Sequence, residues 1–327
     1  MKAFSYERAV DPWDAVAKFR PGSAYLGGGT NLVDLMRLGV AAPDHLVDVS
    51  RLPLEDITDA GGGLRIGAAV RNSDLGAHPL VRRRYPMLAR AVLSGASGQI
   101  RNMATVGGNL LQRTRCPYFQ DITMPCNKRR PGSGCPAVGG EHENLAILGH
   151  SAGSAGGCVA THPSDLAVAL TALTAQVHVV GPGGARVVGL PGLHRLPGDK
   201  PDRDTVLEPG ELITAVELPP PPAGRSAYRK VRERASFAFA LVSVAALIDM
   251  ADDGTVAGCR LALGGVAHVP WRAFMAEQAV LGAPATAETF ARAADAELGQ
   301  AVPLERNAYK VTLARNLITA TLEELSQ

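Results

Sequence analysis

The stretch Leu26-Gly27-Gly28-Gly29-Thr30-Asn31-Leu32 lies between a predicted strand at residues 24–26 and a predicted helix that starts at residue 32 and stops at Gly39. Three successive glycines remove every side chain from the turn. An anionic ligand can therefore approach the backbone N–H groups, and the helix N-terminus adds a favourable dipole. The stretch is not the dinucleotide fingerprint G-x-G-x-x-G, because Leu32 occupies its last position. A plain tight turn is the alternative interpretation.

A second glycine loop, Thr105-Val106-Gly107-Gly108-Asn109-Leu110, has the same make-up of a small hydroxyl residue, a glycine pair and an asparagine. Two such loops in one domain can hold two parts of one extended ligand, for example a pyrophosphate and a sugar. No Gly-Lys pair occurs in the chain, which excludes a Walker A phosphate loop. The two loops together indicate a nucleotide-type cofactor, with two unrelated turns as the alternative.

The cysteines are distributed unevenly. Four of the five, Cys116, Cys126, Cys135 and Cys158, fall in residues 116–158, a stretch of 43 residues, and the fifth is Cys259. Thiolates bind iron–sulfur clusters or zinc in fours, and the spacing here is neither that of a zinc ribbon nor that of a ferredoxin. The nearby cations Arg115 and 128–130 would stabilise an anionic thiolate cluster and tune its potential. Zinc, free buried cysteines and two disulfides are the alternatives.

The composition limits the class of protein. The chain has 327 residues, which suggests two or three domains, and its net charge of +2 gives no indication of nucleic-acid binding. The apolar fraction of 46% excludes disorder as the main state. Residues 1–7 have no apolar signal core, and no apolar run approaches the roughly 18 residues that cross a bilayer. We expect a soluble chain that carries no export signal of its own.

The pattern along the chain predicts an α+β protein. Expected strands are 24–26, 45–49, 64–70, 176–180, 185–189, 212–218 and 227–232, and expected helices include 13–20 and 87–93. Asn72 or Ser73 could cap the helix after residue 70, and Ser164 or Asp165 the helix after residue 165. Residues 104–112 look like a turn-rich segment, and residues 113–160 show no period.

The run 219–222 consists of four prolines, which marks a domain boundary. Beyond it we expect a hairpin of strands 240–249 and 256–265, joined through a turn at 252–254. Three helices, 272–281, 286–298 and 307–325, would complete a small second α+β unit.

A hydrolase-like motif occurs at residues 149–153, which match the nucleophile elbow G-x-S-x-G around Ser151. Asp165 and His178 follow in hydrolase order. However, the elbow serine must open a helix, and the glycines that follow it argue against one. We therefore expect no serine hydrolase.

Residues 27–32 and 105–112 resemble the two FAD-pyrophosphate loops of the flavoprotein (medium) subunit of molybdenum hydroxylases, the xanthine dehydrogenase and carbon monoxide dehydrogenase family. The resemblance continues at residues 162–165, 210–213 and 228–232, and it covers essentially the whole chain. It implies an FAD-binding domain of the vanillyl-alcohol-oxidase/PCMH type over residues 1–219. A small α+β domain of the carbon monoxide dehydrogenase flavoprotein C-terminal type would follow over residues 225–327.

The resemblance also implies the FAD contacts. The two glycine loops would cradle the pyrophosphate, and residues 164 and 165 would hydrogen-bond the ribityl or ribose hydroxyls. One aliphatic residue would pack on the ligand, and one lysine would sit near the flavin. The implied set is Leu26, Gly27, Gly28, Gly29, Thr30, Asn31, Leu32, Thr105, Gly107, Gly108, Asn109, Ser164, Asp165, Ile213 and Lys230, with no catalytic residue.

Ordinary members of this family pass almost directly from the second glycine loop to the Ser-Asp element, whereas this chain inserts residues 113–160. The insertion resembles a narrower group, the 4Fe–4S-containing FAD subunit of bacterial periplasmic aldehyde oxidoreductases. The corresponding subunit of 4-hydroxybenzoyl-CoA reductase is similar too. The resemblance implies that Cys116, Cys126, Cys135 and Cys158 ligate a 4Fe–4S cluster.

The function so implied is electron transfer in a heterotrimeric oxidoreductase that is inactive on substrate without its partners. A large subunit would hold molybdopterin, a small subunit would hold 2Fe–2S clusters, and ferredoxin or another one-electron carrier could dock. The alternatives are a 4-hydroxybenzoyl-CoA reductase-like enzyme with electrons flowing inward, and a non-redox FAD- or nucleotide-binding regulator. The resemblance implies either a periplasmic location, by co-export with a partner, or a cytoplasmic one.

Overall fold

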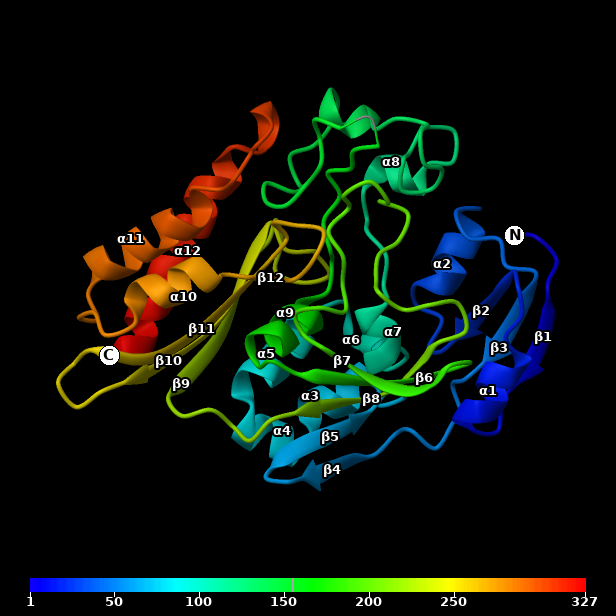
Figure 1. Ribbon diagram of the computed structural model, residues 1–327, viewed down its shortest axis with the longest axis horizontal. Helices are drawn as coiled ribbons and strands as arrows, with labels where there is room; N and C mark the ends of the chain where they lie inside the picture. Colours follow the sequence, from blue (N-terminus) through cyan, green and yellow to red (C-terminus); the bar gives the residue numbers. More distant parts are fainter. Residues whose placement is uncertain (155) are drawn as a thin grey trace.

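The computed structural model describes residues 1–154 and 156–327, which form three sheets arranged along an elongated molecule (Figure 1). The first sheet is parallel, in the order β1-β3-β2, from β1 (Ser5–Arg8), β2 (Ser23–Leu26) and β3 (His45–Asp48). The helices α1 (Pro12–Lys18) and α2 (Leu32–Arg37) connect these strands. Asp11 caps α1 by accepting a hydrogen bond from the backbone N–H of Asp14.

The second sheet is antiparallel and occupies the middle of the molecule. Its order is β4-β5-β8-β6-β7, from β4 (Ile57–Ala60), β5 (Gly63–Gly67), β6 (Gln176–Gly181), β7 (Gly184–Gly189) and β8 (Leu212–Leu218). The helices of this part are α3 (Asn72–Ala77), α4 (Pro79–Arg84), α5 (Pro86–Ser94), α6 (Gly98–Arg101), α7 (Val106–Leu110) and α9 (Asp165–Ala172). Every residue of α9 is buried, as its almost wholly apolar sequence requires.

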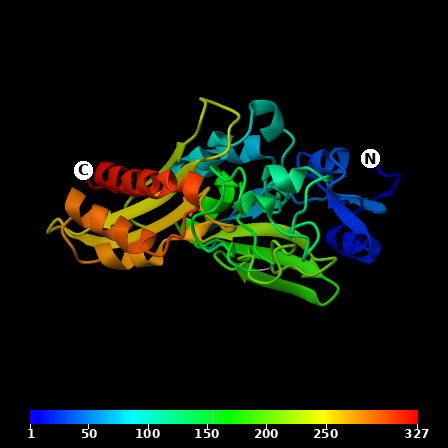
Figure 2. The ribbon, with the colours of Figure 1, turned by 90° about the horizontal axis from the view of Figure 1, so that it is seen from above.

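The third sheet is antiparallel, in the order β12-β11-β10-β9, from β9 (Arg225–Val231), β10 (Val242–Met250), β11 (Val256–Gly264) and β12 (Trp271–Arg272). Three helices, α10 (Phe274–Val280), α11 (Ala287–Leu298) and α12 (Tyr309–Ser326), pack together, and α10 and α12 lie on this sheet (Figures 1 and 2). Helices α5 and α9 also contact it, so the largest core extends from the middle sheet to Tyr228, Ala245 and Ala262.

The insertion 113–160 is mostly irregular, with one short helix, α8 (Pro117–Gln120), and a 3₁₀ turn, η1 (Pro136–Val138). It forms its own small core, to which Leu35 of α2 contributes. A second 3₁₀ turn, η2 (Glu305–Asn307), precedes α12 and lies against the insertion, because the backbone N–H of Arg306 donates to the ring of His142. The insertion therefore contacts both the start and the end of the chain.

The mixed helix and sheet content confirms the α+β prediction, and strand 212–218 and the hairpin β10–β11 are as expected. Two local predictions were wrong, and two strands were missed. Neither Asn72 nor Ser73 caps α3, because both lie inside the helix; the N-cap position is Arg71, which makes no side-chain capping hydrogen bond. Residues 104–112 contain the short helix α7. Strands β1 and β4 were not predicted, because neither alternates apolar and polar residues.

Ser164 caps α9, with its side chain accepting from the backbone N–H of Ala167. Asp165, the other candidate cap, is the first residue of that helix. Among the described helices, none is both long enough and apolar enough to span a membrane.

Candidate functional site

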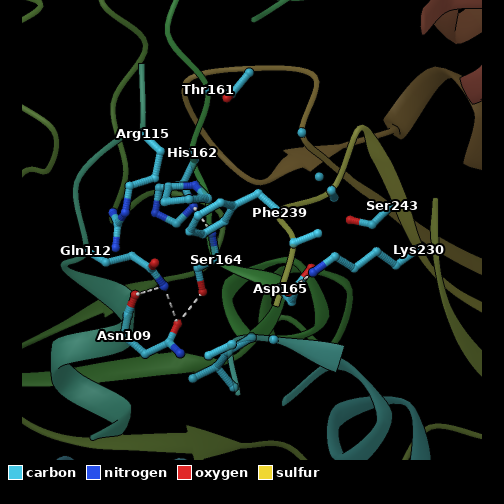
Figure 3. Close-up of a pocket in the computed structure, with 18 of the residues that line it drawn as sticks. Asn109, Gln112, Arg115, Thr161, His162, Ser164, Asp165, Lys230, Phe239 and Ser243 are labelled. Atoms are coloured by element: carbon cyan, nitrogen blue, oxygen red, sulfur yellow. Dashed lines mark hydrogen bonds and ion pairs between the residues drawn. The ribbon is translucent and has the colours of Figure 1, made fainter. Parts of the chain in front are cut away.

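A cavity of about 690 Å³ lies where the two glycine loops, the insertion, the start of α9 and the third sheet meet (Figure 3). Thr30, Asn31, Gly108 and Asn109 line it from the glycine loops. Lys230 and Ser243 line it from the third sheet. The site thus uses side chains from both halves of the chain.

The first glycine loop packs against the backbone just before the second. A Cβ on Gly28 would lie 1.8 Å from the carbonyl oxygen of Met103, so no other residue fits there without a backbone shift. Gly29 has φ +75°, which favours glycine. A Cβ on Gly27 would come within 3.2 Å of Thr105 Oγ1. The glycines therefore let the two loops approach each other closely.

The second glycine loop continues directly into α7. Thr105 caps this helix, with its Oγ1 accepting from the backbone N–H of Gly108 at 3.2 Å. Asn109 Oδ1 accepts from Ser164 Oγ at 2.5 Å and from Gln112 Nε2 at 2.9 Å (Figure 3). These bonds fix the Asn109 side chain at the cavity wall and tie the loop to the start of α9.

Asp165, the residue after Ser164, forms a buried polar cluster at the cavity. Its carboxylate accepts from Lys230 Nζ at 2.8 Å and from the Tyr228 hydroxyl (Figure 3 shows Asp165 and Lys230). Lys230 Nζ also donates to the carbonyl of Ser94 at 3.2 Å, and its side chain is 4% exposed. Burial, together with the Asp165 charge, raises the pKa of Tyr228 well above its usual value.

Several buried polar atoms of the cavity residues have no hydrogen-bond partner among the residues that the structure describes. They are Asn31 Nδ2, Asn72 Oδ1, His162 Nε2 and Ser243 Oγ. Unpaired buried polar atoms are costly, and four on one cavity indicate a polar ligand. The ring of His162 lies edge-on to that of His194 at 4.2 Å, and burial lowers its pKa well below the usual range. His162 is therefore neutral at neutral pH.

The structure brings together many of the predicted FAD residues at the cavity, whereas others do not line it. Thr30, Asn31, Gly108, Asn109, Ser164, Asp165 and Lys230 line the cavity. The remaining predicted residues, Leu26, Gly27, Gly28, Gly29, Leu32, Thr105, Gly107 and Ile213, are not among its lining side chains. Ile213 is 2% exposed and belongs to the main core on β8.

Sequence reasoning missed Asn72, Arg115, His162, Phe239 and Ser243, which all line the cavity. His162 stands beside the recognised Ser-Asp pair, so its position was a usable signal. Asn72 was interpreted only as a helix cap. Phe239, over whose ring the Arg115 guanidinium lies at 5.2 Å, comes from a loop with no pattern of its own.

The four clustered cysteines converge on a second, much smaller hollow of about 10 Å³. Cys116, Cys126, Cys135 and Cys158 all line it, and Cys116 also lines the large cavity. All five cysteines are free, so no disulfide links the four. Within residues 1–154 and 156–327, no group of three or more His, Cys, Asp or Glu side chains is arranged to hold a metal ion.

Burial favours the protonated form of three of these thiols, those of Cys116, Cys135 and Cys158. It raises the pKa of Cys116 to about 11 and that of Cys158 to about 12, although the Lys128 charge acts against the rise at Cys158. Cys135 is shifted upward for the same reason. Thiols of this kind bind as thiolates once a metal displaces their protons.

An ion-pair network beside this hollow contains one buried cation, Lys128, and two partly exposed side chains. Lys128 pairs with Asp204 Oδ1, and Arg113 Nε pairs with Asp204 Oδ2 at 2.7 Å. Burial opposes ionisation of Asp204, but the two cations outweigh it and lower its pKa to about 2. Asp204 is therefore a carboxylate at all ordinary pH values.

The hydrolase-like residues do not form a triad. Ser151 Oγ accepts from the backbone N–H of Cys158 at 3.2 Å, and residues 151–154 form turns instead of a helix. His178 pairs with Glu217 at 3.0 Å, while Asp165 is bonded to Lys230 and Tyr228. The geometry required for a serine nucleophile is not present in these described residues.

Two family models match the chain. Residues 2–221 match the FAD binding domain in molybdopterin dehydrogenase, and residues 226–325 match the CO dehydrogenase flavoprotein C-terminal domain. Together these models span nearly all of the sequence.

Known proteins resemble the chain along its whole length. The aldehyde oxidoreductase FAD-binding subunit PaoB of Escherichia coli is 51% identical, with 99% of this chain and 98% of that protein covered. The glyceraldehyde dehydrogenase medium chain of Sulfolobus acidocaldarius is 29% identical, with 85% and 81% covered.

The fold also matches a solved structure. Carbon monoxide dehydrogenase from Hydrogenophaga pseudoflava aligns with a TM-score of 0.75 and 27% identity, covering 98% of this chain and 96% of that one. On these grounds the chain belongs to the FAD-binding medium subunits of the molybdenum hydroxylase family, and it is an oxidoreductase flavoprotein subunit.

Proposed function

We propose that this chain is the FAD- and 4Fe–4S-binding electron-transfer subunit of a heterotrimeric, molybdenum-dependent aldehyde oxidoreductase. The observation that carries the proposal is the 51% identity with a protein named as an aldehyde oxidoreductase FAD-binding subunit. The convergence of four cysteines from an insertion on one hollow supports it further.

The polarity and the donor set of the large cavity suit FAD. Its unpaired polar atoms and the backbone of the glycine loops suit the hydroxyls and the diphosphate of a dinucleotide. When bound, FAD exchanges electrons in pairs or singly, which lets it link two-electron and one-electron partners. We propose that Asn31, Asn109 and Ser243 bind and orient it.

The protein side of this site is rigid and already organised. Asp165 is held by Lys230 and Tyr228, and Asn109 is held by Ser164. A wall fixed in this way orients a ligand at little entropic cost. Phe239, with Arg115 beside its ring, covers part of the cavity and would exclude water there.

We propose that the four cysteines bind a 4Fe–4S cluster and not a single zinc ion. The thiols share one hollow but are not arranged around one ion, and a four-iron cluster spreads its thiolates more widely. The hollow of about 10 Å³ must widen during loading. Residues 113–160 are mostly irregular backbone, and such segments shift more readily than helices or sheets.

A molybdopterin-binding large subunit and a 2Fe–2S small subunit are the proposed partners, with ferredoxin or another one-electron carrier as acceptor. Arg130 is exposed near the cysteines and could favour an acidic carrier, whereas Arg129 donates to the carbonyls of Tyr118 and Met124. Charge reversal at Arg130 should slow turnover with ferredoxin and leave turnover with a small dye unchanged. Equal effects on both acceptors would exclude a docking role.

The proposal is tested on the complex purified with its partner chains. We expect flavin absorption bands, and iron and acid-labile sulfide at four of each beyond those of the small subunit, together with aldehyde oxidation. Replacing the four clustered cysteines with serine should remove this extra iron and sulfide but leave FAD bound. Cys259→Ser is the matched control, because this cysteine lies on β11 outside the hollow. A complex without the extra iron would refute the cluster, and a colourless chain would favour a non-redox regulator.

A further inference from the structure

Five cationic side chains lie close in sequence to the first two cysteines, and Lys128 is the one among them that lines the cysteine hollow. Arg115 lies beside the ring of Phe239 at the large cavity, Arg129 donates to backbone carbonyls, and Arg130 is exposed. Lys128 lines the hollow together with all four cysteines. The structure therefore distinguishes Lys128 from the neighbouring basic residues, which the sequence alone cannot do.

Lys128 is a buried, fixed cation. Its side chain is 2% exposed, and its Nζ donates to the carbonyl of Pro201 at 2.9 Å and pairs with Asp204. Asp204 is shared with Arg113, whose guanidinium lies over the ring of Phe119 at 4.7 Å. The network thus contains two cations and one carboxylate, which leaves a net positive charge beside the thiols.

This excess charge has a defined effect on an anionic cluster. Four thiolates around iron and sulfide carry net negative charge, and a one-electron reduction adds another. A buried cation is poorly screened by salt. It therefore stabilises the reduced cluster, which carries the additional negative charge, more strongly than the oxidised cluster. Burying an ammonium group is costly, and the Asp204 and Pro201 contacts offset that cost.

We propose that Lys128 is a positioning residue of the cysteine site, whose buried charge compensates the thiolates and raises the reduction potential of the cluster they bind. Asp204 holds the ammonium in place and moderates its charge. Arg113 links this pair to the large cavity, because its backbone N–H donates to Asn31 Oδ1 at 2.9 Å. This role of Lys128 rests on the proposed 4Fe–4S site, whose negative charge the Lys128 side chain compensates.

The experiment compares variants of opposite electrostatic sign in the purified complex. Lys128→Met removes the cation with little change in volume, Asp204→Asn removes the carboxylate, and Lys128→Arg keeps the charge. Arg130→Met is the matched control, because it removes an exposed, screened charge from the same segment. Iron, sulfide and FAD are quantified for each variant. The midpoint potential of the reduced-cluster EPR signal is then measured by redox titration.

We expect Lys128→Met to shift the midpoint potential to more negative values, Asp204→Asn to shift it to more positive values, and Arg130→Met to leave it unchanged. Loss of iron in Lys128→Met, with FAD retained and with iron retained in Lys128→Arg, also supports the proposal. An unshifted potential in Lys128→Met overturns it, as do shifts of the same sign in both variants. Iron loss in both Lys128 variants would show a role of shape, which also overturns it. Absence of the extra iron from the unmodified complex would instead refute the proposed function.

Discussion

At the scale of single residues, the site depends on the absence of side chains as much as on their presence. Gly28 lies against the backbone of Met103, and Gly29 has a backbone conformation suited to glycine. Both positions determine how closely the two glycine loops approach each other. A change there affects the backbone geometry that a diphosphate would meet.

Gly28→Ala is expected to destabilise the protein and to weaken FAD retention. Its Cβ would lie 1.8 Å from the Met103 carbonyl oxygen, so the backbone must move, at a cost of about 1–3 kcal/mol for such overpacking. Thermal unfolding and the FAD content of the purified complex measure the two effects. Gly183→Ala is the control, because a Cβ there meets no atom within 4 Å. Equal behaviour of the two variants would show that the close approach is unimportant.

Asp165→Asn is expected to cost about 3–5 kcal/mol, the range for breaking a buried ion pair, because Lys230 would keep a buried charge without a carboxylate. Asp295→Asn, which breaks the exposed pair with Arg315, should cost about 1 kcal/mol or less. Denaturant unfolding of both variants at neutral pH measures the difference. Similar losses would mean that the Asp165 cluster is not structurally important.

At the scale of elements, two helices begin with the same kind of cap in different surroundings. Ser164 caps α9 at the large cavity and also donates to Asn109 Oδ1. Thr286 caps α11, with its side chain accepting from the backbone N–H of Thr289, and it does not line the cavity. Comparing Ser164 with Thr286 therefore distinguishes the contribution of a helix cap from the contribution of a side chain at the cavity.

Ser164→Ala and Thr286→Ala are each expected to lower stability by about 1 kcal/mol through the lost cap. Only Ser164→Ala should also weaken FAD retention, because it frees the Asn109 side chain at the cavity wall. Unfolding curves and FAD dissociation rates of the two variants test this. An equal change in FAD dissociation would show that Ser164 acts only through helix stability.

Elements with a strong local pattern could be predicted from the sequence. Strand β8 and the hairpin β10–β11 are apolar runs bounded by turn residues, and α9 is an apolar run after a serine cap. Strands β1 and β4 could not be predicted, because partner strands stabilise them and their own sequences do not. The helix α7 contains two glycines, and only its Thr105 cap hints at it.

The parts of the candidate site that depend on backbone conformation could be predicted from the sequence. The parts that depend on tertiary packing could not. The two glycine loops could be identified because each combines consecutive glycines with a small hydroxyl residue and an asparagine. Phe239 and Asn72 were missed because only tertiary packing brings them to the cavity. The FAD assignments of the glycines that do not line the cavity, and of Ile213, stay predictions. The four cysteines do share one hollow, but the irregular path between them has no period from which to predict it.

At the scale of the whole molecule, the insertion is tied to the last helix through a buried lysine. Lys310 is 0% exposed, and its Nζ donates to the carbonyl of Leu145 at 2.9 Å and to that of Gly265. Burial lowers its pKa from 10.5 to about 7. The contact therefore connects the cysteine insertion, the third sheet and α12 through one titratable group.

The free energy of unfolding is expected to rise as the pH increases from about 7 towards 10. Over this range the unfolded chain keeps the Lys310 proton while the folded chain releases it, so the unfolded state binds more protons. The contribution is a few kcal/mol at most, at about 1.4 kcal/mol per pKa unit. Lys310→Met should lack this rise. Denaturant unfolding of both proteins between pH 7 and 9.5 tests the prediction, and parallel profiles would contradict it.

The insertion also bears on the order in which the protein can be assembled. Its backbone and side chains bond to residues 302–310, and these bonds join positions 152 to 166 residues apart. A ribosome adds roughly 5–20 residues per second, so the cysteines emerge many seconds before the segment that holds their loop. Until then the four thiols lie on a loop that lacks its contacts with residues 302–310. The proposed cluster therefore requires a chain that extends at least to residue 310, because a translation product that stops earlier lacks contacts that hold the cysteine loop.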